Sequence, residues 1–166
     1  MRTRLQNYFE KENIGLFFLI GCMSGFLHSL TWPTFQIFSL TFFYYVPFLI
    51  LLQKIKNPKT VVALSFGHSF SQTVFGFSWL AYMAEAFGGM PSFIAPIMVL
   101  LYGLIGELQH VFFALGLWWI YKKYQTRPPL IVTAFFYVAC DYIYPRIFCD
   151  TQGAMLFPWK NFIQTA

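Results

Sequence analysis

The chain has 166 residues, of which 58% are hydrophobic, 22% aromatic and only 10% charged. Because a soluble domain carries about a quarter charged residues, this composition excludes an ordinary soluble domain and predicts an integral membrane protein. The net charge of +5 comes from short scattered clusters and not from a basic stripe, so it does not indicate a nucleic-acid partner.

The first elements are a mixed-charge segment and an apolar run. Residues 1–13 predict a short interfacial segment on the cytoplasmic side, and residues 14–30 predict the first transmembrane helix. Within this run, Leu19-Ile20-Gly21-Cys22 matches the pattern at which bacterial lipoprotein precursors are cleaved. The acidic residues upstream and the apolar sequence after Cys22 favour instead a small-residue patch, 21–25, for close helix packing.

Four more apolar runs complete the predicted fold class, an all-α integral membrane protein with about five transmembrane helices. The predicted helices lie at about 35–52, 61–84, 93–121 and 130–147, within a transmembrane domain spanning 14–147, and 148–166 is expected to be an external tail cut off before further helices. Nine of the eleven basic residues fall on one side of these helices: Arg2, Arg4, Lys11, Lys54, Lys56, Lys59, Lys122, Lys123 and Arg127. This bias predicts a multi-pass protein with a cytoplasmic N-terminus.

Candidate metal ligands centre on Glu107 and His110, whose spacing of three puts a carboxylate and an imidazole on one helix face. A metal site needs further ligands, and the remaining candidates are Glu85, Asp141, His68 and His28. A single copy of the spacing favours a buried polar contact between helices over a metal site. We therefore predict no bound metal and no cofactor.

Two other chemistries involve the same histidines. His28, His68 and His110 could supply paired axial ligands to a haem, and Ser69 or Ser71 near His68 could form a nucleophile and base. Histidines commonly serve as hydrogen-bond partners between helices, and no orienting acid accompanies the serines. The residue types alone predict no catalytic constellation.

One stretch, residues 75–91, carries a family resemblance. Gly76-Phe77, Ser78-Trp79, Tyr82 and Phe87-Gly88-Gly89-Met90-Pro91 resemble the corresponding stretch of the apolipoprotein N-acyltransferases, enzymes of the bacterial inner membrane. Further agreement, in the same order along the chain, comes from Trp32-Pro33, Phe48 to Leu52, Asp141 with Arg146, and Phe157-Pro158-Trp159. Asp141 departs from the family pattern, which has Glu there.

The resemblance implies that the complete enzyme transfers a fatty acyl chain from a phospholipid to the N-terminal cysteine of a lipoprotein. It implies a catalytic Glu, Lys and Cys in a nitrilase-like domain beyond this chain, so the chain alone is expected to be inactive. Substrate contacts at a rim where acyl chains enter would come from Trp79, Tyr82, Phe87, Gly88, Gly89, Met90 and Pro91, with Asp141 and Arg146 pairing or touching a head group. The same rim residues could simply fix a helix–turn–helix geometry.

The expected partners are phospholipid, a lipoprotein substrate and a separate catalytic domain. An alternative of another class is a non-catalytic small membrane protein that binds lipid or a partner subunit. In that case His68, Gln72, Glu107 and His110 would form its helix contacts.

Overall fold

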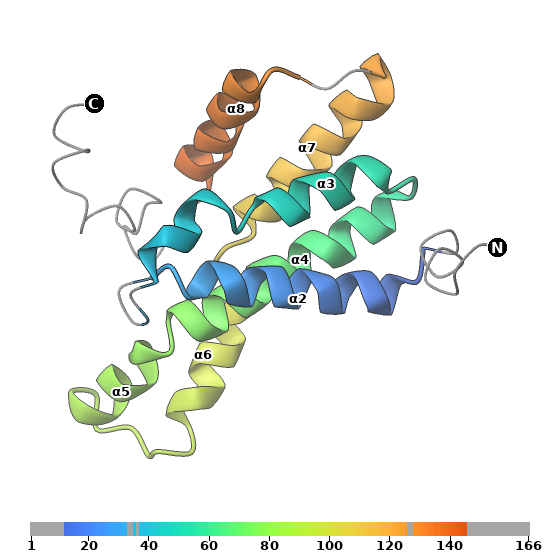
Figure 1. Cartoon of the computed structure of the whole chain (residues 1–166). Coiled ribbons are helices and arrows are strands. Elements are labelled where there is room, and N and C mark those ends of the chain that lie inside the picture. Colours follow the sequence, from blue (N-terminus) through green and yellow to red (C-terminus); the bar gives the residue numbers. More distant parts are fainter. Residues whose placement is uncertain (1–11, 33–34, 36, 126–127, 146–166) are drawn as a thin grey trace, which may run out of the picture.

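The computed structural model describes residues 12–32, 35, 37–125 and 128–145, and these form helices joined by turns, with no strand among them (Figure 1). The helices are α2 (Ile14–Ser29), α3 (Val46–Lys54), α4 (Pro58–Gly76), α5 (Trp79–Ala86), α6 (Ala95–Gly103), α7 (Gln109–Tyr124) and α8 (Leu130–Ile143), with a 3₁₀ turn η1 (Phe38–Phe42). The predicted all-helical character is confirmed over this part of the chain.

Helix α4 lies at the centre and packs against α2, α6 and α7, while α3 and α8 pack against α7 (Figure 1). Helices α5 and α6 form a hairpin that projects from the C-terminal end of α4, away from α8 (Figure 1). The buried apolar side chains between α2, α3, α4 and α7 are Phe17, Phe48, Leu52, Ile55, Val61, Leu64, Phe113, Ala114 and Leu117. This larger cluster lies toward the N-terminal half of α4, and a second, smaller one, Trp32 and Phe77, lies where α4 meets the hairpin.

Glycines set the close approach of α2 and α4. A Cβ atom on Gly21 would overlap the carbonyl oxygen of Leu64, one on Gly25 would overlap that of His68, and one on Gly67 would overlap that of Phe18. Backbones can come this near only where neither helix carries a side chain. The predicted role of the 21–25 patch in close helix packing is confirmed at its two glycines.

Hydrogen bonds to Glu12 join the start of α2 to the start of α4. Its carboxylate accepts hydrogen bonds from the backbone N–H of Lys56 at 2.5 Å and of Asn57 at 2.9 Å, and from the Thr60 hydroxyl at 3.3 Å. Asn57 also caps α4 by accepting from Lys59 N–H at 3.0 Å. A carboxylate at a helix N-terminus meets unsatisfied donors and the positive end of the helix dipole. Both helices therefore start at the same end of the molecule and run side by side in the same direction.

The prediction of about five transmembrane helices is wrong. No helix in the described part of the chain is both long enough and apolar enough for a membrane crossing. The expected helix at 61–84 is interrupted at Phe77 and Ser78, and the one at 93–121 is interrupted between Gly103 and Gln109. Helices α2 and α7 have 16 residues each, about 24 Å, and the 19-residue α4 buries a series of polar side chains.

Candidate functional site

The interior of the molecule is unusually polar where α2, α4 and α7 meet. Fully or nearly fully buried polar side chains in this region include Ser24, His28, Ser65, His68, Ser69, Ser71, Gln72, Thr73, Glu107, Gln109 and His110. Buried polar groups cost free energy unless they find partners. The partners of these buried side chains therefore show which polar groups the structure brings together.

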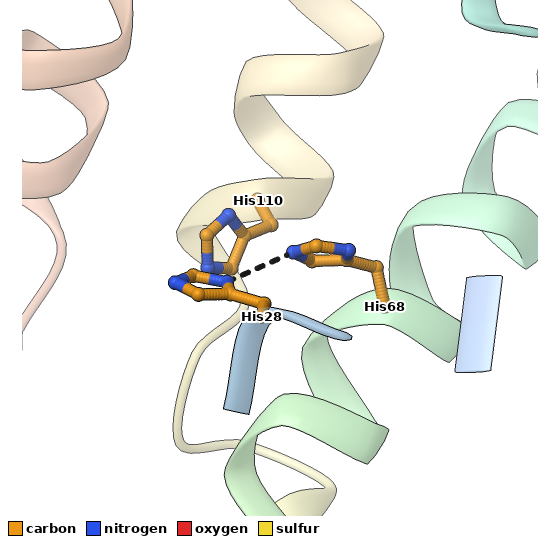
Figure 2. A group of neighbouring side chains, drawn as sticks. All are labelled: His28, His68 and His110. Atoms are coloured by element: carbon orange, nitrogen blue, oxygen red, sulfur yellow. Dashed lines mark hydrogen bonds between the residues drawn. The ribbon is translucent and has the colours of Figure 1, made fainter. Parts of the chain in front are cut away.

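Three imidazoles form the centre of this polar interior (Figure 2). His28 comes from α2, His68 from α4 and His110 from the first turn of α7, and all three are 0% exposed. One ligating nitrogen of each lies within 4.8 Å of the others. His28 Nδ1 lies 3.2 Å from His68 Nε2, and the ring centroids are 4.9 to 5.7 Å apart. The rings converge from three separate helices toward one point (Figure 2).

Hydroxyl groups contact the outward-facing nitrogens of two of these rings. His68 Nδ1 lies 3.1 Å from Ser24 Oγ, and His110 Nδ1 lies 3.0 Å from the Tyr45 hydroxyl oxygen. Tyr44 stacks on His28 with ring centroids 3.9 Å apart. These contacts fix the orientation of each imidazole from outside the cluster.

A buried carboxylate lies beside the cluster. Glu107 is 2% exposed, and its Oε2 is 3.9 Å from His110 Nε2 and accepts a hydrogen bond from the Gln109 amide. The Ser69 hydroxyl donates to the backbone carbonyl of Glu107, which ties the α6–α7 junction to α4. Glu107 and His110 therefore lie near each other, but Glu107 precedes α7 and does not share its helix face as expected. The predicted buried polar contacts between helices are those of His110 with Tyr45 and of Ser69 with the Glu107 carbonyl.

Burial affects the protonation of His68. Removal from water lowers the pKa of His68 from 6.5 to about 3, because a buried charged imidazole loses its hydration. His68 is therefore neutral near pH 7, with one ring nitrogen carrying a lone pair.

An apolar pocket adjoins the cluster. It has a volume of about 400 Å³ and lies between α3, α7 and α8, lined by Tyr44, Tyr45, Leu49, Phe113, Leu130, Thr133, Ala134, Tyr137 and Val138. Tyr45 belongs to both features, since its ring lines the pocket and its hydroxyl contacts His110. A second pocket of about 370 Å³, between the ends of α3 and α7, includes Lys54 and Lys122.

The rim residues predicted from sequence lie on the α5–α6 hairpin. Trp79, Tyr82 and Phe87 are 39%, 68% and 77% exposed. Gly88 and Gly89 follow the end of α5, and Gly89 adopts the left-handed region at φ 63°, which favours glycine. Met90 is half-buried and Pro91 is exposed in the same turn. The structure thus gathers these residues at one end of the molecule.

Asp141 lies elsewhere. It is half-buried on α8, which is separated from the hairpin (Figure 1). Arg146 lies outside the described residues, as do residues 1–11 of the expected interfacial segment 1–13 and the tail containing Phe157-Pro158-Trp159. The rim and Asp141 are therefore not brought together.

The structure also bears on the alternatives raised by the sequence. Ser69 is bonded to the Glu107 carbonyl and His68 contacts Ser24 and His28, so Ser69 and His68 do not form a nucleophile and base. The direct contact between His28 and His68 leaves no space for a macrocycle between these rings. The sequence offered the three histidines together as candidate metal or haem ligands, but it could not show that they meet, because a spacing of 40 residues or more carries no local signal of proximity.

The described residues thus define an all-helical domain with a polar centre and a largely apolar exterior. The family described as the apolipoprotein N-acyltransferase N-terminal domain matches residues 24–165. The chain therefore belongs to this family, which confirms the resemblance seen at residues 75–91. No curated protein and no solved structure matches the chain.

Proposed function

We propose that this chain acts as the N-terminal domain of an apolipoprotein N-acyltransferase. The complete enzyme would transfer an acyl chain from a phospholipid to the N-terminal cysteine of bacterial lipoproteins at the inner membrane. The observation that carries this proposal is the family match over residues 24–165.

Apolar side chains on the outside of the molecule support contact with phospholipid. On the hairpin, Phe87 and Phe93 are 77% and 72% exposed; on α8, Leu130, Tyr142 and Ile143 are 83%, 90% and 79% exposed. Large contiguous apolar surfaces mark sites for lipid or for another protein. Phospholipid and a separate catalytic domain are the partners of the proposed function.

The cysteines of the described residues do not resemble catalytic nucleophiles. Burial raises the pKa of both the Cys22 and the Cys140 thiol, and a raised pKa reduces the reactive thiolate. The family resemblance implies that the nucleophile forming the thioester intermediate would reside in the separate domain, with its Glu and Lys. The chain alone would bind lipid without transferring acyl groups.

Within this function, the α5–α6 hairpin would form the rim by which acyl chains reach the catalytic domain. Trp79, Tyr82 and Phe87 would contact the chains, and Gly88 to Pro91 would hold the turn. Asp141, with Arg146, would contact a phospholipid head group at a second place on the molecule.

The test is a chimera. The catalytic domain of another family member, joined to this chain in place of its own N-terminal domain, is incubated with phospholipid vesicles and a peptide bearing a lipid-modified N-terminal cysteine. Mass spectrometry should show the peptide gaining one acyl chain with the chimera and none with either part alone. Acyl transfer by the chain alone would contradict the inactive-alone proposal.

A matched control uses the same chimera with its catalytic cysteine replaced by serine, which should bind vesicles and yield no product. A chimera that folds, binds vesicles and never transfers an acyl chain would favour the other class of function, a non-catalytic protein that binds lipid or a partner subunit.

A further inference from the structure

We propose that His28, His68 and His110 bind one first-row transition-metal ion of the Zn²⁺ class, with the Glu107 carboxylate beside it. This site is independent of the acyl transfer proposed above, and it stabilises the junction of α2, α4 and α7.

The separations suit a shared ion. Two nitrogens bound to one tetrahedral zinc at about 2.0–2.1 Å each lie about 3.3 Å apart. His28 Nδ1 and His68 Nε2 are already 3.2 Å apart. The wider separations, up to 4.8 Å, must shorten by up to about 1.5 Å, which rotations of the imidazole side chains supply.

The outer contacts leave the right nitrogens facing inward. A ligating histidine normally donates its other ring N–H to an oxygen, which fixes its tautomer. In this arrangement His68 Nδ1–H donates to Ser24 Oγ and His110 Nδ1–H donates to the Tyr45 hydroxyl oxygen. Nε2 of His68, and Nε2 of His110, then carry lone pairs toward the centre.

Ligand type and burial favour an ion of this class. Imidazole nitrogen suits Zn²⁺, Co²⁺, Ni²⁺ and Cu²⁺ and not Mg²⁺ or Ca²⁺, which prefer oxygen. All three rings are fully buried, as in closed structural sites. Glu107 Oε2 lies 3.9 Å from His110 Nε2, so a carboxyl group adjoins the three nitrogens.

A buried amide side chain, Gln72, lies near the cluster. Gln72 lies one turn beyond His68 on α4, and neither its amide nitrogen nor its oxygen finds a hydrogen-bond partner among the described residues. Buried amides without partners are rare in proteins. The interface of α2 and α4 is therefore built around more than apolar packing.

Metal content of the purified full chain tests the proposal. The chain is prepared with a histidine-free affinity tag, stripped with a chelator, and titrated separately with Zn²⁺, Co²⁺ and Mg²⁺. We expect one Zn²⁺ and one Co²⁺ per chain and no saturable Mg²⁺. The Co²⁺ spectrum should show tetrahedral nitrogen and oxygen ligation without a thiolate charge-transfer band.

Variants separate the site from folding. His68→Gln and His110→Gln should each abolish one-to-one binding. Ser24→Ala removes only the outer contact of His68 and should weaken Zn²⁺ binding by about 10- to 100-fold. Its matched control is Ser65→Ala, a buried serine on α4 whose hydroxyl bonds the carbonyls of Val61 and Val62, and which should bind Zn²⁺ normally.

Circular dichroism establishes that each variant remains helical before its binding is compared. No saturable Zn²⁺ binding by the folded wild-type chain would overturn the proposal, as would undiminished binding by both histidine variants. Equal binding by Ser24→Ala and Ser65→Ala would overturn the assignment of His68 Nε2 as a ligand. Loss of binding in a Cys22→Ser, Cys140→Ser variant would assign the metal to the thiols and contradict the histidine site.

Discussion

The junction of α2, α4 and α7 and the α5–α6 hairpin use opposite chemistry. The junction buries histidines, serines and a carboxylate, whereas the hairpin leaves Tyr82, Phe87 and Phe93 at 68% to 77% exposure. A polar interior needs complementary contacts in fixed geometry, while an apolar exterior needs a covering partner. The junction therefore depends on exact contacts between helices, whereas the hairpin presents exposed apolar side chains.

The largest expected effect comes from widening the junction. Gly25→Ala places a Cβ against the His68 carbonyl oxygen, so α2 and α4 must separate and the contact between His28 and His68 is lost. We expect a loss of about 3 kcal/mol in the free energy of unfolding, measured by chemical denaturation. Gly15→Ala is the matched control, since its Cβ meets only the Asn13 side chain at 3.4 Å; an equal loss in both variants would contradict the close-packing explanation.

The next largest effect comes from weakening the hydrogen bonds by which Glu12 joins the start of α2 to the start of α4. Glu12→Gln removes the charge that accepts hydrogen bonds from Lys56 and Asn57 N–H. We expect a loss of about 1–2 kcal/mol in unfolding free energy, because hydrogen bonds to charged groups are the stronger ones and the helix dipole adds to them. Glu85→Gln, on α5, removes the same charge away from α4's start and should cost less than about 0.5 kcal/mol. A larger loss for Glu85→Gln than for Glu12→Gln would show that the Glu12 hydrogen bonds do not stabilise the packing of α2 against α4.

The smallest effect on stability belongs to the hairpin, where the effect on lipid binding should be clear. The double variant Tyr82→Ser, Phe87→Ser should unfold like the wild type, because both side chains are exposed. Its partition onto phospholipid vesicles should fall about tenfold, from the loss of roughly 1.4 kcal/mol of apolar burial. Tyr142→Ser on α8 is the comparison variant. If Tyr142→Ser weakens partition onto vesicles and the double variant does not, α8 contacts the lipid and the assignment of the hairpin as the lipid-contacting rim is wrong.

The sequence predicted the helical class and the family, and it misjudged the length of continuous helix. Hydropathy over 61–84 and 93–121 does not register the turns at Phe77-Ser78 and at 104–108, because apolar residues within them, such as Phe77, Leu104 and Ile105, keep the average high. The proximity of Glu107 to His110 could be predicted from their spacing of three. The approach of His28 to His68 could not be predicted, because it depends on how α2 packs against α4.

The glycines that let α2 and α4 pack closely also determine how far apart the histidines lie. Gly25 and Gly67 set the distance between the two backbones, and that distance sets the gap between His28 and His68. One methyl group at either glycine would disrupt the cluster without altering any of its own side chains. Across an alignment of family members, glycine at these two positions and histidine at 28, 68 and 110 should therefore be gained and lost together.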